Sequence, residues 1–237
     1  LAGTGILGLG IMMGGYWAYE MLGWGGYWAW DPVENSSLIP WLIGVASIHT
    51  MLVQKRSLKS TDGIGRYAKT NLILSILTYV LVLYSTFLTR SGVLGDASVH
   101  SFVDPGNLVY FFLLIFISTF IAIGIGGIVY RWKYLEDKTV YEESTLSREL
   151  ALFTASIILV ASAIIVLVGT SAPLFGQAVD TFFYDEMHLP IGIIIGLLNG
   201  LSLLIKWKST NTKDLIKDSA LAIIVSLVLT GLVVLLG

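Results

Sequence analysis

The chain has 237 residues, of which 55% are hydrophobic and 13% are charged, and its mean hydropathy is +0.81. Soluble globular domains carry roughly 25% charged residues, so this composition excludes an ordinary soluble domain and indicates a membrane protein. The absence of cysteine excludes disulfides, thiolate ligands and thiol redox chemistry from this chain. We expect no nucleic-acid partner.

Continuous apolar stretches predict an all-α fold, a polytopic integral membrane helix bundle that forms one domain over residues 1–237. About 20 apolar residues are needed to cross a bilayer, and these stretches lack the alternation of a barrel wall. Because the first residue is Leu1, inside an apolar stretch, we expect a piece of a longer protein or a split subunit. About seven transmembrane helices are predicted, near residues 1–19, 38–54, 67–89, 107–130, 150–170, 188–205 and 219–236.

Basic residues predict the topology of these helices. Thirteen of the fourteen Lys and Arg residues follow the second, fourth and sixth predicted spans, and only Arg90 falls in the other loops. By the positive-inside rule, the thirteen face the cytoplasm, and the connector 131–149 is a cytoplasmic loop to which we assign no chemistry. The segment 20–37 and the loop 90–106 then share the outer face of a plasma membrane or an organellar inner membrane, and this face is acidic.

Tryptophan is concentrated in the outer segment. Five of the seven tryptophans lie between residues 17 and 41, and several are interleaved with glycine in WGGYWAWDPVEN. An aromatic belt has fewer aromatics at each helix end. Asp31 is expected to be extended because Pro32 follows it, and Asn35, Ser36 and Ser37 are candidate caps for the next helix. The candidate binding residues are Trp24, Tyr27, Trp28 and Trp30.

Aromatic side chains beside glycines suit a large planar apolar ligand, because indole faces stack on flat rings and indole N–H groups bind polar edges. Sugars and quaternary ammonium ions would also bind such a surface. The residues themselves leave these three ligand classes open.

Three histidines are present, His49, His100 and His188. His49 lies about 16 Å along the second predicted helix from Leu38, near the middle of the membrane, where an ionisable residue usually marks a functional site. His100 lies in the outer loop, and His188 begins the sixth predicted span. Imidazole is a common ligand of metals and haem, so these residues are candidate axial ligands, with a neutral, hydrogen-bonded histidine as the alternative.

Three blocks of sequence resemble a known family. WGGYWAWDPVENSSLIPW, followed by the histidine of SIHT, is similar to the tryptophan-rich WWD signature of the haem-handling proteins of cytochrome c maturation. YSTFLTRSGVLGDASVHSF is similar to a loop of the CcmF family, as is the lead-in GGYWAYEMLGWGG. The resemblance runs through most of the chain.

This resemblance implies a haem-binding membrane component of a haem lyase, and thus part of a holocytochrome c synthase. Haem on the outer face would be positioned for thioether attachment to a CxxCH apocytochrome c. The WWD segment would hold the haem edge, His100 would bind the haem iron, and His49 would bind the iron of a separate haem b. Expected partners are a haem chaperone, the apocytochrome and other maturation subunits.

The chain departs from the family pattern in its histidines. The family has a second outer histidine before the WWD segment and a second membrane histidine in a later helix, and neither has a counterpart here. We therefore expect other subunits to supply the missing ligands. His188 matches no ligand of the family.

Three further residues are candidates for roles at the same site. Asp31 and Glu34 are expected to hold the loop by hydrogen bonds or to attract a cationic partner. Arg90 is a candidate partner for a haem propionate, with a helix-end residue that extends to the interface as the alternative.

Two other functions remain compatible with the sequence. One is a haem transporter or chaperone that presents haem without attaching it. The other is a transporter that holds a cationic solute in an aromatic cage.

Overall fold

The computed structural model describes residues 1–21, 26–58, 63–95, 97–98, 100–102, 105–136, 144–177 and 179–236. All regular structure in these ranges is helical, which confirms the predicted fold class. The elements are α1 (Ala2–Met21), α2 (Pro32–Leu58), α3 (Ala68–Arg90), α4 (Asn107–Arg131), α5 (Arg148–Ser171), η1 (Ala172–Phe175), α6 (Thr181–Leu204) and α7 (Thr212–Leu236).

Six helices of the described chain are long and apolar enough to cross a membrane, namely α2, α3, α4, α6, α7 and α5 with η1. The chain is therefore an integral membrane protein. The helix α1 has 20 residues, but glycine, tyrosine and tryptophan replace many of the aliphatic residues that a span usually carries. This helix is the first of the seven spans predicted from the sequence, and it is not among the six candidate membrane spans of the structure.

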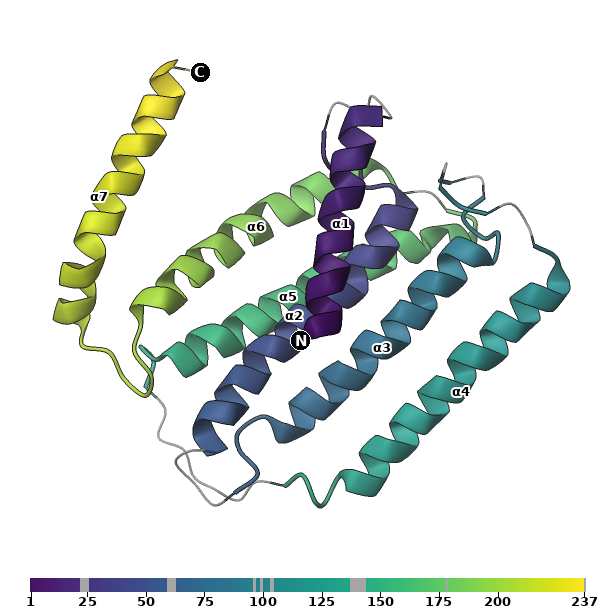
Figure 1. The fold of residues 1–237 in the computed structure, drawn as a ribbon, viewed down its shortest axis with the longest axis horizontal. Coiled ribbons are helices and arrows are strands. Elements are labelled where there is room, and N and C mark those ends of the chain that lie inside the picture. The colour runs from purple at the N-terminus through teal and green to yellow at the C-terminus, as the bar shows by residue number, and fades with distance from the viewer. Residues whose placement is uncertain are drawn as a thin grey trace.

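The helices α2 and α5 lie at the centre of the bundle (Figure 1). The helix α3 packs on α2 and α4 packs on α3, while α6 packs on the opposite flank of α5. The helix α1 crosses α2, and α7 contacts the rest of the chain only near the end of α6. This order leaves α4, α6 and α7 with large apolar surfaces exposed.

The hydrophobic core lies where α2 packs against α3 and α5. Aliphatic side chains of α2 interlock with those of α3 on one side and α5 on the other. Each fully buried Leu, Ile or Val contributes about 1.5–3 kcal/mol where it leaves water, and close packing sustains the contact within the membrane. The buried residues of this cluster are Ile39, Leu42, Ile43, Ala46, Leu74, Leu81, Leu159, Ala163 and Val166.

Polar side chains join α2 to α3 inside the span. The hydroxyls of Ser36 and Ser85 lie 3.0 Å apart, and Thr50 donates to the amide oxygen of Asn71. Such bonds hold membrane helices together because lipid offers no alternative partner. On the other flank, the hydroxyl of Ser156 on α5 donates to the carbonyl of Ala46, 3.2 Å away.

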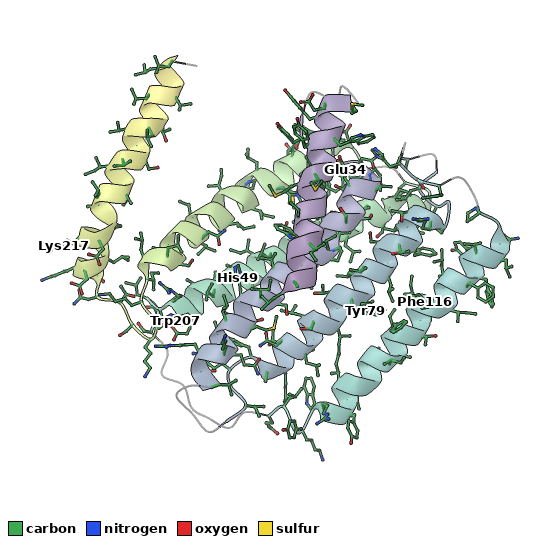
Figure 2. The ribbon with its side chains drawn as sticks, in the orientation of Figure 1. Glu34, His49, Tyr79, Phe116, Trp207 and Lys217 are labelled. Atoms are coloured by element: carbon green, nitrogen blue, oxygen red, sulfur yellow. The ribbon has the colours of Figure 1, made fainter. Side chains whose placement is uncertain are left out.

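The two ends of the bundle carry different charged residues. Figure 2 shows Glu34 at one end and Trp207 and Lys217 toward the other. At the basic end, the guanidinium groups of Arg56 and Arg148 lie 5.8 and 5.4 Å from the centre of the Trp207 ring. The three loops that were predicted to be basic therefore meet at one end.

Two helices begin earlier than predicted. The helix α2 begins at Pro32, and the carboxylate of Asp31 accepts from the N–H of Val33 at 2.9 Å, so Asn35, Ser36 and Ser37 lie inside the helix instead of capping it. Proline suits the first helical position because it needs no amide partner there. The helix α6 begins at Thr181, so His188 lies two turns inside it and does not start the span.

The helix α1 rests on α2 through glycines. The indole of Trp41 covers Gly8, and the side chain of Thr4 packs on Gly44. A Cβ at Gly8 would overlap the Trp41 ring, so the absence of a side chain lets the two helices approach closely.

The contact between Thr4 and Gly44 predicts that cysteines introduced at these two positions form a disulfide. A Cβ built on Gly44 lies 3.5 Å from the Cβ of Thr4, within the range of about 3.5–4.5 Å that disulfides need. Since the chain has no cysteine, Thr4→Cys with Gly44→Cys is expected to form a bond within the protein, measured by the loss of maleimide labelling after denaturation. Gly5→Cys with Gly44→Cys is the matched control because a Cβ at Gly5 meets no atom within 4 Å. Equal oxidation of both pairs would contradict this docking of α1.

Candidate functional site

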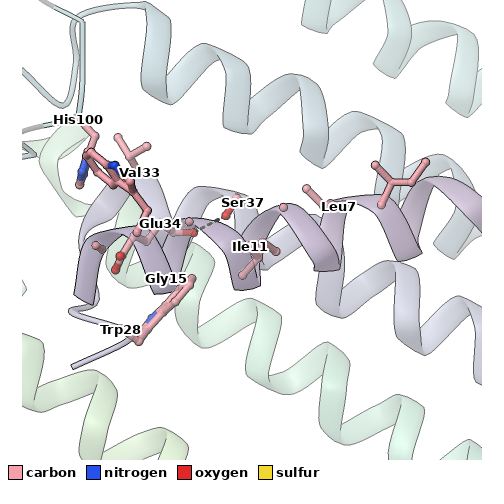
Figure 3. A pocket seen from close by; sticks show the side chains of 13 residues that line it. Leu7, Ile11, Gly15, Trp28, Val33, Glu34, Ser37 and His100 are labelled. Carbon is pink, nitrogen blue, oxygen red and sulfur yellow. Dashed lines mark hydrogen bonds between the residues drawn. The ribbon is translucent and has the colours of Figure 1, made fainter. Parts of the chain in front are cut away.

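A groove of about 530 Å³ runs along α1, beside the first turns of α2 (Figure 3). Its lining is mostly apolar and contains a few polar side chains, as is usual for sites that bind small molecules. The lining residues are Ile6, Leu7, Gly10, Ile11, Gly14, Gly15, Trp17, Ala18, Trp28, Val33, Glu34, Ser37 and His100.

One wall of the groove is a glycine face of α1. Gly10 and Gly14 are one helical turn apart, and a Cβ on either would meet no atom within 4 Å. Their missing side chains leave room beside the backbone, between Ile11 and Trp17. A flat molecule can therefore lie close to this part of α1.

Asp31 joins the groove to the loop that follows α3. One carboxylate oxygen accepts from the N–H of Val33 at 2.9 Å and from the hydroxyl of Ser98 at 2.8 Å, and it lies 3.3 Å from Nδ1 of His100. The side chain of Asp31 is 10% exposed and that of His100 is 26% exposed. Ser98 also accepts from the backbone N–H of His100 at 3.1 Å, which fixes the start of this turn.

His100 has the surroundings of a metal-binding histidine. Its ring meets that of Trp17 edge to face, with 6.3 Å between centres. A carboxylate on Nδ1 fixes the orientation of an imidazole and makes Nε2 the nitrogen that binds a metal. The Asp31 contact therefore predicts the tautomer of His100 that carries its proton on Nδ1.

Trp28 contributes its aromatic ring to the lining of the groove. Its indole nitrogen is buried and, among the residues that the structure describes, has no hydrogen-bond partner. A buried donor without a partner costs about 1–3 kcal/mol. Because this nitrogen has almost no accessible surface, a ligand in the groove would contact the ring of Trp28 and not its N–H.

Glu34 is the carboxylate that lines the groove, and it also closes the tryptophan loop. One of its oxygens accepts from the N–H of Ala29 at 3.1 Å. Its backbone carbonyl accepts from the hydroxyl of Ser37 at 2.7 Å, the bond drawn in Figure 3.

Trp30 points away from the groove, toward α6. Its φ of 57° is left-handed, which is uncommon for a bulky residue, and the amide of Asn35 donates to its carbonyl at 2.9 Å. Its indole N–H donates to Asp185 at 2.7 Å, and its ring stacks on that of Tyr184 at 5.1 Å. The rings of Trp28 and Trp30 are almost perpendicular, at 87°, so they do not form one flat surface.

Tyr27 is not among the described residues that line the groove. The ring of Tyr27 stacks on that of Tyr19, with 4.6 Å between centres, and is exposed. The carbonyl of Tyr27 lies against Gly15, where a Cβ would come within 2.7 Å. Trp24 lies outside the described residues.

Arg90 ends α3 beside the same loop as His100. Its guanidinium lies 4.2 Å from the centre of the Phe102 ring. Although exposed, it does not line the groove.

His49 is remote from the groove. It lies 17 residues into α2, about 26 Å along the helix from Pro32. Figure 2 shows it far from Glu34 on the same helix. Its Nδ1 is buried and finds no hydrogen-bond partner in the described part of the chain. The structure thus keeps His49 and His100 at separate places.

His188 packs under the tryptophan loop. Its ring lies 4.8 Å from that of Trp30, and its Nδ1 is 3.0 Å from the carbonyl of Tyr184. It does not line the groove.

Sequence reasoning missed the contribution of α1. This helix supplies eight of the thirteen described residues that line the groove, among them the glycines at positions 10 and 14 and the tryptophan at position 17. Their spacing of three and four residues is the available signal, since it places them on one helix face. No pattern in the sequence indicated that Ser98 would bond to Asp31 and His100.

The helices and the groove together define a polytopic membrane protein with an apolar groove at one end of its bundle, beside a histidine that a carboxylate holds. Residues 1–94 match the family described as Cytochrome C assembly protein. Over these residues the chain resembles this family.

The chain also resembles the c-type biogenesis protein CcmF. It is 36% identical to CcmF of Haemophilus influenzae, covering 88% of this chain and 31% of that protein. It is 34% identical to CcmF of Escherichia coli K12, covering 97% and 35%. A solved structure named Cytochrome c Heme Lyase CcmF matches with a TM-score of 0.63 and 33% identity, covering 88% and 29%. The chain thus spans about a third of the length of the curated relatives it matches.

The hydrogen bond between Trp30 and Asp185 predicts that substitutions of these two residues have non-additive effects on stability. Trp30→Phe keeps an aromatic ring against Tyr184 but removes the donor to Asp185, which is expected to lower the free energy of unfolding by about 1 kcal/mol. Asp185→Ala should cost a similar amount, and the double variant should cost little more than either single one. Thermal unfolding in detergent, followed by circular dichroism, measures all three. Simple addition of the two single effects would contradict the bond.

Proposed function

We propose that this chain is a haem-binding membrane component of cytochrome c maturation, with haem as the substrate held in the groove. The observation that carries the proposal is His100 at the edge of an apolar groove, with Nδ1 held by Asp31. Relatives that are named as c-type biogenesis proteins, and a solved relative named as a haem lyase, support it.

The residues of the groove fit haem in size and chemistry. Its volume of about 530 Å³ lies within the range of roughly 300–1,000 Å³ that is usual for small-molecule sites. The glycine face of α1 suits the porphyrin plane, and the ring of Trp28 supplies an aromatic wall. Nε2 of His100 is the proposed iron ligand.

Other candidate residues have supporting roles in this proposal. Asp31 orients His100 and caps α2. Arg90 lies at the end of α3, beside the loop of His100, where its guanidinium suits a haem propionate at the outer rim. We propose that Trp24, Tyr27 and Trp30 complete the loop around the substrate, with Trp30 anchoring it to α6.

The reaction proposed for the assembled machinery is the addition of the two CxxCH thiols to the vinyl groups of haem. The bond-forming chemistry belongs to haem and the thiols, and this chain would bind and orient. Its acidic end, which we place on the outer face of the plasma membrane or of an organellar inner membrane, would receive haem from a chaperone and meet the apocytochrome.

We also propose that His49 binds the iron of a second, membrane-embedded haem b. The buried Nδ1 without a partner in the described chain supports a ligand at this position. The second axial ligand of each haem is proposed to come from other maturation subunits.

Haem titration tests the groove. Asp31→Asn is expected to weaken haem binding about 10-fold, since losing a partner that orients a metal ligand typically costs 10–100-fold in affinity. His100→Gln should weaken it further. The measurement is Soret absorbance of the purified protein in detergent. His188→Gln is the control because His188 lies at the same end and does not line the groove. Equal losses in the two histidine variants would contradict the assignment.

A second experiment separates a haem lyase from a haem carrier. The purified protein is mixed with reduced haem and a CxxCH apocytochrome, without another lyase, and mass spectrometry measures thioether formation. Covalent product supports attachment by this chain. Transfer of haem without a thioether supports the carrier.

A further inference from the structure

A second cavity lies at the opposite, basic end of the bundle. It has a volume of about 360 Å³ and lies between the beginning of α3 and the chain that follows α4. Its lining residues are Gly65, Tyr67, Ala68, Lys69, Leu135 and Glu136. No element of the haem groove contributes to it.

Positive charge gathers around this cavity. The ammonium of Lys69 lies 4.3 Å from the centre of the Trp132 ring, which holds it at the cavity wall. The guanidinium of Arg66 lies 5.2 Å from the centre of the Tyr67 ring, and Arg131 ends α4 just before the lining begins. Among the described residues, Lys69 and Glu136 are the charged members of the lining, and the neighbouring Arg66 and Arg131 make the surroundings net positive, which suits an anion.

The neighbouring aromatic residues place the cavity at the membrane surface. Tyr130, Trp132 and Tyr134 follow one another near the end of α4, and all three are exposed. Tyrosine and tryptophan with exposed ring surface are typical of the level of lipid headgroups.

An apolar surface continues from the cavity into the span. The helices α3 and α4 meet at Ile76 and Gly124, while Gly126 and Gly127 have open space beside them. The remaining face of α4 is mostly exposed aliphatic and aromatic side chain. A molecule with an anionic head in the cavity can therefore lay acyl chains along α4.

We propose that this cavity binds the phosphate headgroup of an anionic phospholipid, with Lys69 as the principal donor. Basic pockets between membrane helices, at the end that carries positive charge, are suited to such headgroups. The proposal does not rest on haem binding. It assigns the basic end of the bundle a lipid site that anchors α3 and α4 to each other.

Native mass spectrometry tests the site, with the full chain loaded with phosphatidylglycerol or with phosphatidylcholine. Lys69→Gln is expected to lower phosphatidylglycerol retention about fivefold, since one basic residue near the surface contributes about 1 kcal/mol. Lys69→Arg should retain it. Lys217→Gln is the matched control, because Lys217 also lies toward the basic end and does not line the cavity.

Three outcomes would overturn the proposal. They are equal retention of both lipids, equal losses in Lys69→Gln and Lys217→Gln, and displacement of phosphatidylglycerol by millimolar inorganic phosphate. If Lys69→Gln does not fold, Glu136→Gln provides a second variant. Removing that acid should raise phosphatidylglycerol retention, and unchanged retention would also overturn the proposal.

Discussion

The carboxylate of Asp31 is the contact on which the outer end of the molecule depends. A single oxygen caps α2 through Val33, holds Ser98 and orients His100. It thereby ties two loops, separated by almost seventy residues, to the start of one central helix. Together with the edge-to-face contact of the Trp17 ring, this contact positions His100 at the groove.

The central helix α2 connects that contact to the rest of the bundle. Its first turns form a wall of the groove, its middle packs between α3 and α5, and Gly44 receives α1. The close approach of α1 and α2 is possible because Gly8 and Gly44 lack side chains. The glycines at positions 10 and 14 also lack side chains, and on the neighbouring face of α1 this leaves space for a ligand.

Sequence patterns predicted the helices well because their signal is local. Apolar stretches predicted the seven α-helices of the described chain, though not the short helix η1, and the distribution of lysine and arginine predicted the loops that meet at one end. Trp30 shows where this reasoning stops, since its direction depends on Asp185, which is 155 residues away, and on a left-handed backbone. The cap of α2 was misplaced because Asn35, Ser36 and Ser37 have the composition of caps, whereas Pro32 and Asp31 begin the helix. The groove was not foreseen because it requires α1 to dock on α2.

The central claim is that haem lies between α1 and the first turns of α2, with its iron at His100. An experimental structure of the haem-loaded protein in lipid nanodiscs tests it most directly. The account predicts porphyrin density against Gly10 and Gly14, with Nε2 of His100 at coordination distance from the iron. Porphyrin bound elsewhere, with the groove filled by lipid or side chains, would contradict it.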